Sequence, residues 1–329
     1  MADFSELIGQ EHIKEELKKA LEKKTVSHAY IFVGEAGSGK SILAKRFAMA
    51  LQCESSEGKP CMKCRSCKMA LSDNHPDIIT IRHEKPALIS VDEVRKQLVD
   101  DMPIKPYSGP HKIYIIPEAH KMNLQAQNAL LKTLEEPPSY GVIILLTDNA
   151  LAMLPTIISR CTLMSLRPVK DSVIKEYLTR ELHISDHQAD LCIAFARGNP
   201  GRARNLAVND SFSKLRTEVL YLIKNIKSMD SDAMFEVIKK LVEYKNDIDD
   251  ILDMITLWYR DVLLYKSTEN RDRLVFKDEL EGIKEYSKRS SFEAMEAVIK
   301  KLDITRERLK ASVKAELALE LLLFTIKEN

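Results

Sequence analysis

The stretch that most constrains the fold is residues 34–41 (GEAGSGKS), which match the phosphate-binding loop pattern G-x-x-x-x-G-K-[ST] at every fixed position. It stands in the required context, because residues 28–33 (HAYIFV) are typical of an apolar strand and residues 42–51 of a helix. A glycine turn without a ligand is the alternative, and the flanking strand and helix count against it. The sequence therefore predicts a P-loop near the start of an α/β domain.

The chemistry of this loop gives each of its fixed residues a role. Gly34, Gly37 and Gly39 let backbone N–H groups turn inward around a phosphate, and the following helix adds the positive end of its dipole. Lys40 is placed to reach the β- and γ-phosphates of ATP or ADP, and Ser41 is placed to hold Mg²⁺. These five residues form the predicted cofactor-binding set of the loop.

Further strand candidates follow the loop. Residues 76–81 are one of them, and residues 112–116 and 142–146 are continuous apolar runs of the kind found in buried parallel strands. Helical segments separate these strands, so that strands and helices alternate from residue 28 to residue 166. This alternation predicts a parallel sheet that is covered by helices on both faces.

The residues that follow two of these strands bear on ATP hydrolysis. After strand 112–116 we expect an Asp that orders Mg²⁺ and a Glu that polarises the attacking water. The chain has Pro117 and Glu118 there, and Pro117 offers the metal no carboxylate. Glu118 is therefore either a catalytic residue or an ordinary exposed carboxylate. Thr147, after strand 142–146, is placed to touch a γ-phosphate.

Four of the six cysteines lie together in the segment 53–67. Cys53, Cys61, Cys64 and Cys67 are separated by seven, two and two residues, which is the ligand count and short spacing of a structural tetrahedral Zn²⁺ site. Thiolates favour zinc over magnesium or calcium, and an iron–sulfur cluster or unliganded thiols are the alternatives. A Cys₄ site has no open coordination position, so we expect it to fold this insertion without taking part in catalysis.

Beyond residue 167 the strand pattern stops and helical patterns continue to the end. Arg202 lies in the first turn of a helix after residues 198–201 (GNPG), where it is placed to reach back to a nucleotide; a solvated helix charge is the alternative. A terminal helix is predicted over residues 309–326. It has too many large apolar residues for one stripe, which predicts burial on more than one side, either at a subunit interface or inside a self-contained bundle.

Composition limits the partners and the compartment. The 329 residues include 50 Lys and Arg and 49 Asp and Glu, so the net charge of +1 gives no global electrostatic case for nucleic acid or an anionic membrane. No apolar run approaches the ~20 residues of a membrane span, and the N-terminus has neither a basic nor an apolar signal region. We therefore expect a cytoplasmic protein of two or three domains whose cysteines are thiols or metal ligands.

Several other segments, read together with the P-loop and the cysteines, carry a family resemblance. They are residues 8–11 (IGQE), 27–30 (SHAY), 105–107 (KPY), 125–138 (QAQNALLKTLEEPP), 159–161 (SRC) and 198–202 (GNPGR). An SRC motif after a leucine-rich TLEEPP helix is a signature of clamp loaders among AAA+ proteins. Over almost its whole length the chain resembles the AAA+ clamp-loader subunits of bacterial DNA polymerase III. Within the family, residues 125–127 and a chain that ends after one helical collar favour the delta-prime type, with gamma/tau as the near relative.

This resemblance implies a three-part architecture. An AAA+ nucleotide-binding domain over residues 1–167, with the zinc insertion at 53–67, precedes a small three-helix lid over 168–208 and a helical collar over 209–329. The collar joins this chain to gamma/tau and delta subunits in a hetero-pentameric ring. The implied function is ATP-dependent loading of the sliding clamp onto primer–template DNA during replication, as part of the DNA polymerase III holoenzyme, with no membrane contact.

The resemblance also implies roles for single residues. Arg160 of the SRC motif is the arginine finger, presented in trans to ATP on the adjacent gamma/tau subunit. Thr147 is the first sensor and Arg202 the second sensor of any nucleotide bound by this chain. Pro117 departs from the active ATPases of the family. We therefore favour a largely structural subunit that binds nucleotide but hydrolyses little of it. The alternative is a catalytically active AAA+ ATPase, such as a gamma/tau-like motor or another remodeller.

Overall fold

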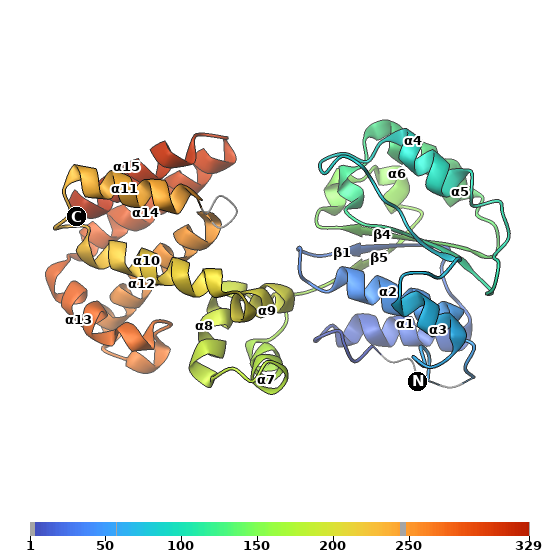
Figure 1. Ribbon diagram of the computed structural model, residues 1–329, viewed down its shortest axis with the longest axis horizontal. Helices are drawn as coiled ribbons and strands as arrows, with labels where there is room; N and C mark the ends of the chain where they lie inside the picture. Colours follow the sequence, from blue (N-terminus) through green and yellow to red (C-terminus); the bar gives the residue numbers. More distant parts are fainter. Residues whose placement is uncertain (1–3, 57, 244–247, 329) are drawn as a thin grey trace. The chain divides into compact units, whose positions relative to one another are not determined.

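Two compact units make up the structure, which is a computed structural model (Figure 1). The described part of the chain comprises residues 4–56, 58–243 and 248–328. The first unit contains the residues up to Tyr177 together with Gly198–Arg202. The second contains Leu178–Arg197 and the residues from Ala203 onward. The predicted boundaries of the three domains stay predictions.

A five-stranded sheet with parallel pairing throughout forms the centre of the first unit. Its strands are β1 (Ala29–Val33), β2 (Ile78–Thr80), β3 (Lys112–Ile116), β4 (Gly141–Thr147) and β5 (Thr162–Ser165). They lie in the order β2-β3-β4-β1-β5. Ala29 of β1 is opposite Ile143 of β4, and Ile113 of β3 is opposite Val142 of β4. The predicted parallel sheet is confirmed, although β2 is shorter than the strand expected at residues 76–81.

Both faces of the sheet are buried, which explains why its central strands are mostly apolar, and the buried Lys112 that begins β3 is paired with Asp101 at 2.9 Å. On β1, Tyr30 and Phe32 belong to the core on one face, whereas Ala29 and Ile31 belong to the core on the other. Successive side chains of a strand point to opposite faces, so a strand covered on both sides has no solvent-facing position. This burial is the physical reason that the strands could be recognised as unbroken apolar runs.

Helices cover the two faces of the sheet (Figure 1). On one side lie α1 (Glu11–Lys23), α2 (Lys40–Gln52) and α3 (Arg65–Leu71), and on the other α4 (Val91–Val94), α5 (Leu124–Glu135) and α6 (Pro155–Ile158). Short π or 3-10 turns are η1 (Arg95–Val99), η2 (Ala119–Lys121) and η3 (Ala150–Ala152). At the start of α4, Ser90 and Glu93 form a capping box. At the start of α5, the Asn123 side chain accepts a hydrogen bond from Ala126 N at 2.8 Å.

A buried aspartate ties the loop before β3 to the sheet. Asp77 is fully buried, and its carboxylate accepts hydrogen bonds from Tyr107 N (2.7 Å), Ser108 N (2.8 Å) and the Ser108 hydroxyl (3.0 Å). A buried carboxylate is tolerated only where such donors replace its water. Asp77 therefore fixes the path of a loop whose Tyr107 side chain is itself exposed.

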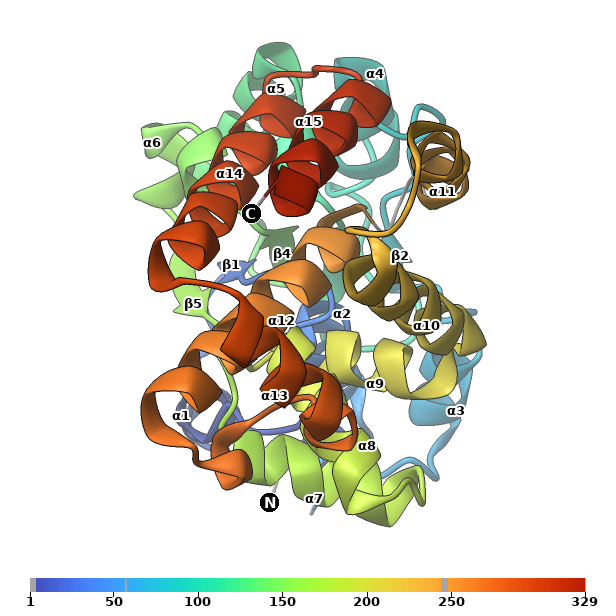
Figure 2. The same cartoon turned by 90° about the vertical axis from the view of Figure 1, so that its left-hand side faces the viewer.

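The elements of the second unit are all helices over its described residues, joined by loops. Helices α7 (Asp171–Glu181) and α9 (Pro200–Val208) contribute residues to both units. The remaining elements are α8 (Asp186–Ala196), α10 (Asp210–Asn225), α11 (Ser231–Glu243), α12 (Ile248–Thr268), η4 (Arg271–Arg273), η5 (Lys277–Glu279), α13 (Leu280–Arg289), α14 (Phe292–Lys310) and α15 (Ala315–Glu328). Helix α12 is central, because α10, α13 and α14 pack against it and its Trp258 and Tyr259 are fully buried (Figure 2). None of the described helices is both long and apolar enough to cross a membrane.

The terminal helix predicted over residues 309–326 is present, but its predicted start is wrong, because the helix begins only at Ala315. Helix α14 ends at Lys310 and α15 begins at Ala315, after a turn in which Ser312 has a φ of 62°. The Ser312 N–H donates to the Leu309 carbonyl, which satisfies one of the free carbonyls at the helix end. The turn lets α15 fold back onto α14, and this packing buries apolar surface that one continuous helix would leave exposed.

Helix α15 buries a single stripe within the chain. Its buried residues are Ala318, Leu319, Leu322, Leu323 and Ile326. By contrast, the side chains of Leu317 and Leu321 are 50% and 36% exposed. The interior of a self-contained bundle therefore does not explain these two leucines, and the subunit interface stays a prediction.

Replacement of Asp77 by alanine is expected to destabilise the protein by about 2–4 kcal/mol, because two backbone N–H groups and a hydroxyl lose a charged acceptor. Asp100→Ala is the matched control, since Asp100 is exposed. The measurement is urea-induced unfolding followed by circular dichroism. Equal midpoints for the two variants would contradict the role given to Asp77.

Candidate functional site

The P-loop leaves β1 and enters α2, as the sequence predicts, and two of its glycines adopt left-handed backbone conformations. The φ angles of Gly37 and Gly39 are 84° and 98°, a region that residues with a Cβ rarely adopt. A Cβ on Gly39 would also lie 2.4 Å from Leu7 Cδ1, because the N-terminal segment packs against the loop. The loop shape therefore requires glycine here for both conformation and space.

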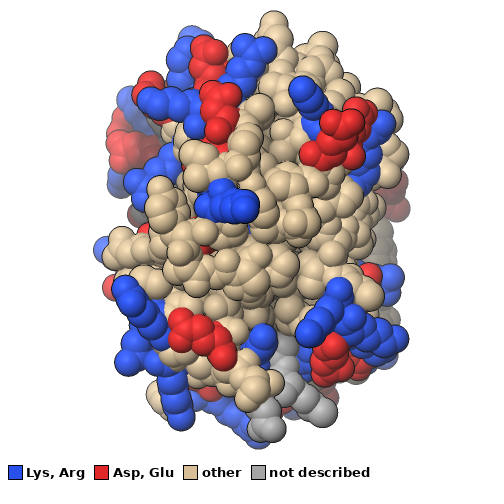
Figure 3. Space-filling view, turned by 90° about the vertical axis from the view of Figure 1, so that its right-hand side faces the viewer, with Lys and Arg blue, Asp and Glu red and all other residues tan. Residues whose placement is uncertain are grey.

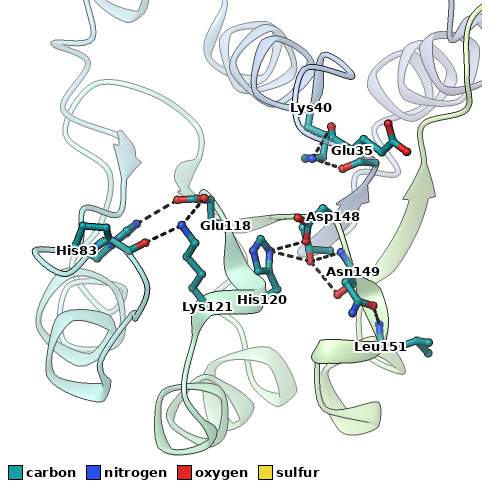
Figure 4. A network of polar contacts seen from close by, with 12 residues as sticks. Glu35, Lys40, His83, Glu118, His120, Lys121, Asp148, Asn149 and Leu151 are labelled. Atoms are coloured by element: carbon teal, nitrogen blue, oxygen red, sulfur yellow. Dashed lines mark hydrogen bonds and ion pairs between the residues drawn. The ribbon is translucent and has the colours of Figure 1, made fainter. Parts of the chain in front are cut away.

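Lys40, the first residue of α2, turns back onto its own loop (Figure 4). Its Nζ donates to the carbonyls of Gly34 and Glu35, the latter at 3.0 Å. Burial lowers the pKa of Lys40, and the nearby carboxylates of Asp148, Glu35 and Glu118 partly offset that effect. The ammonium group thus lies at the mouth of the loop among acidic groups, where an incoming phosphate would replace the loop carbonyls as its partner.

Other features of the loop fit a bound polyphosphate. The Ser38 hydroxyl is buried and has no hydrogen-bond partner among the described residues. Ser41 is exposed, which leaves its hydroxyl accessible to a metal ion. The first N–H groups of a helix have no acceptor within the helix, so those of α2 are available to an anion. The donor set is therefore suited to the phosphates of a nucleotide.

Glu118, after β3, is engaged in contacts that lead away from the loop (Figure 4). Its carboxylate lies 2.6 Å from Lys121 Nζ and 3.6 Å from His83 Nε2. The hydrogen bond from Lys121 lowers the pKa of Glu118. Glu118 is therefore an ionised group that is held by its neighbours, beside a proline that offers no metal ligand. Sequence reasoning did not identify His83 or Lys121, since neither belongs to a motif.

Thr147 ends β4, and the strand pairing places it next to the start of the P-loop. Gly34 N donates to the Thr147 carbonyl at 3.0 Å. The Thr147 hydroxyl is buried and bonds within its own turn, donating to the Asn149 carbonyl at 3.0 Å and accepting from Asn149 N at 3.1 Å. His120 Nδ1 lies 3.0 Å from the neighbouring Asp148 carboxylate. Asp148 is thus an additional polar group at this edge of the sheet (Figure 4).

The two predicted arginines lie in different places. Arg202 is in the first turn of α9, and this turn touches the loop, because Gly201 N donates to the Gly37 carbonyl at 3.1 Å. Arg160 lies between α6 and β5, where it forms an ion pair with Glu135 (2.8 Å). The structure therefore brings the turn of Arg202 to the P-loop, whereas the observed contacts of Arg160 are made elsewhere.

The four clustered cysteines converge on one point. Their sulfur atoms all lie within 4.8 Å of one another. Four sulfurs about 2.3 Å from a tetrahedral Zn²⁺ are separated by about 3.8 Å, so the cluster needs little change to hold the ion. Backbone N–H groups of Cys61, Cys64 and Cys67 each donate to the sulfur of the preceding cysteine in the set at 3.3 Å. The donor set and spacing fit a structural zinc ion.

The thiols of the cluster differ in how easily they ionise without a metal ion. Burial raises the pKa of Cys53 and of Cys67, which opposes ionisation when no cation is near. Hydrogen bonds from backbone N–H groups, that of Lys63 first, lower the pKa of Cys61 to about 6. A divalent ion would compensate the repulsion among four adjacent thiolates and allow all of them to ionise.

Comparison with known families gives matches in both units. A family model described as "DNA polymerase III, delta subunit" matches residues 9–170. A second model, "DNA polymerase III, delta subunit, C terminal", matches residues 211–328. The two matches together take in the P-loop, the cysteine cluster and most of the helical second unit.

Two relatives agree with this assignment, and one solved structure shares the fold. DNA polymerase III subunit delta' of Bacillus subtilis is 31% identical, over 97% of each chain. Subunit tau of the same organism is also 31% identical, over 93% of this chain and 58% of tau. A solved DNA polymerase III gamma subunit-related protein from Thermotoga maritima superposes with a TM-score of 0.50 at 22% identity, over 95% of this chain and 98% of that one. The last match shows the fold and agrees with the predicted AAA+ P-loop fold.

Proposed function

Because this chain belongs to the DNA polymerase III delta-subunit family, we propose that it is a delta-prime-type clamp-loader subunit that holds ATP or ADP with little turnover. The observation that carries this proposal is an intact P-loop beside Pro117 and an engaged Glu118. Lys40 and Ser41 would hold the phosphates and Mg²⁺. The groups that would activate water are missing or held by other residues.

Arg160 is proposed to act on a neighbouring subunit. Its side chain is 35% exposed, and its partner Glu135 is 50% exposed. An ion pair this accessible to water is weak, and the hydrogen bonds that Arg160 also donates to the Thr156 carbonyl (2.9 Å) and the Ser159 hydroxyl (3.3 Å) are exposed, so a more strongly charged phosphate can replace these partners. This geometry supports an arginine finger in trans, and Glu135 would hold the side chain in the free subunit.

The proposed partners are gamma/tau and delta subunits in a hetero-pentamer, with the sliding clamp and primer–template DNA reached through the assembly. The exposed Leu317 and Leu321 of α15 support a subunit interface in the collar, residues 209–329, beyond a lid at 168–208. On the face drawn in Figure 3, cationic and anionic side chains intermingle around a largely uncharged band. This face has no continuous basic field, and DNA contact is proposed for the assembled ring, where basic residues of several subunits can line a channel.

The cysteine cluster is proposed to bind one structural Zn²⁺ ion. Cys53 follows α2 and Cys67 lies within α3, so the ion would link the two helices. The apolar core around the cluster is small, with Met49 and Ala70 as its other buried members. A bound metal adds its binding free energy to the folding of such a segment.

The purified chain is expected to bind ATP and ADP but to hydrolyse ATP slowly, because Pro117 removes a metal ligand and Lys121 holds Glu118. Binding is measured by calorimetry and turnover by phosphate release, with Lys40→Ala as the variant that loses the cation in the loop. Steady-state turnover that disappears in Lys40→Ala would favour the active ATPase instead.

Reconstitution with tau and delta subunits tests both membership of the complex and the role of Arg160. We expect a stoichiometric complex that loads clamps, and a lower ATPase rate when it contains Arg160→Ala. An arginine finger is worth ~10³–10⁵ in rate in GTPases, so hydrolysis at the adjacent site should nearly stop. Arg204→Ala is the control, since Arg204 is exposed. An unchanged rate would remove Arg160 from the mechanism, and failure to assemble would refute the proposed function.

Metal analysis of protein prepared without chelator is expected to find one zinc per chain. Cys64→Ala should lose the metal and lower the melting temperature, because three thiolates do not complete the tetrahedral site. Cys161→Ala is the control, as Cys161 lies outside the cluster. Absence of zinc from the unaltered protein, or full retention in Cys64→Ala, would contradict the assignment.

A further inference from the structure

We propose that Asn199 is a positioning residue for the nucleotide phosphates, because its side chain holds the backbone of the P-loop in the shape that receives them. This inference rests on the nucleotide binding proposed above and adds a residue outside the loop to it. Asn199 lies directly before α9, within the first unit, and only 6% of it is exposed.

Both ends of the Asn199 side chain are used. Its Nδ2 donates to the Ala36 carbonyl at 2.7 Å, and its Oδ1 accepts from Arg202 N at 3.1 Å. These partners fix the orientation of the amide, since a carbonyl accepts only from the nitrogen end and a backbone N–H donates only to the oxygen end. One side chain thus caps the first turn of α9 and fastens that turn to the P-loop.

Glycines allow the close approach of the P-loop backbone to the first turn of α9. Gly201 N donates to the Gly37 carbonyl at 3.1 Å, which is a second hydrogen bond between the two segments beside that of Asn199. A Cβ on Gly201 would lie 2.4 Å from the Gly37 carbonyl oxygen, and one on Gly37 would lie 2.8 Å from Asn199 Oδ1. The two segments therefore fit together only with glycine at both positions.

The direction of these bonds matters for phosphate binding. In a planar trans peptide the carbonyl and the N–H point to opposite sides. Because Asn199 holds the Ala36 carbonyl toward α9, the N–H of Gly37 in the same peptide unit points away from α9. That N–H has no acceptor among the described residues, so it is available to an anion. Asn199 thereby orders one donor of the phosphate nest before the ligand arrives.

Variants of Asn199 separate this role from capping of the helix. In Asn199→Ser the hydroxyl can still accept from Arg202 N, but the side chain is too short to donate to Ala36. We expect about tenfold weaker binding of both ADP and ATP by calorimetry, since one buried hydrogen bond is lost. Amide hydrogen exchange of residues 35–38 in nucleotide-free protein should become faster. Asn205→Ala, an exposed position on α9, is the matched control.

Gly201→Ala gives a second test, in which the substitution favours α9 and does not weaken it. Alanine favours helix formation over glycine, so weaker nucleotide binding in this variant cannot come from loss of α9. We expect binding at least as weak as in Asn199→Ser, because the Cβ displaces the Gly37 carbonyl.

The outcomes distinguish this inference from the proposal on which it rests. If the unaltered chain binds neither nucleotide, the proposed nucleotide site fails, and the positioning role fails with it. If it binds nucleotide and Asn199→Ser matches it in affinity and in exchange of residues 35–38, nucleotide binding stands and the positioning role of Asn199 is refuted.

Discussion

The double burial of the parallel sheet is the constraint on which the functional residues of the first unit depend. Strands β1, β3 and β4 are neighbours, and apolar cores on both faces hold their order and register. Their carboxyl ends lie along one edge, where the P-loop leaves β1, Glu118 follows β3 and Thr147 ends β4. The hydrogen bond from Gly34 N to the Thr147 carbonyl joins the loop directly to β4. The apolar strands themselves carry few polar side chains, but their packing brings together the polar residues that follow them in the sequence.

The charged groups at this edge are satisfied by their own neighbours. Lys40 donates to loop carbonyls, Glu118 contacts Lys121 and His83, and Asp148 lies beside His120 (Figure 4). Nucleotide binding requires few contacts to be broken, because phosphate oxygens can replace carbonyls as partners of Lys40 and can accept from free backbone N–H groups. Hydrolysis requires a larger change, since Glu118 would have to leave Lys121 and the metal would lack a ligand at Pro117. This asymmetry supports the proposed subunit that holds nucleotide with little turnover.

Elements outside the sheet rely on different physical means. The cysteine insertion has a small apolar core, so hydrophobic burial stabilises it little, and a bound metal ion is suited to supply the missing folding free energy. The helical unit depends instead on packing around α12. Trp258 and Tyr259 of this helix are fully buried, and its Asp253 forms ion pairs with Arg197 and Arg306. On its surface Leu317 and Leu321 remain exposed, and these residues carry the argument for a partner.

The sequence by itself determined the P-loop, the parallel α/β sheet and the cysteine set, because each of these is local in sequence: a fixed spacing of glycines and lysine, unbroken apolar runs and paired CxxC steps. Only the tertiary structure decided the break between α14 and α15, since local helix propensity continues across it and packing of the two helices rewards the turn. The same is true of the contact between Glu118 and His83, which lies in the loop before α4, and of the contact between Asn199 and Ala36, which are 163 residues apart. Side-chain partners at such separations follow from how the strands and helices pack, and no spacing in the sequence records them.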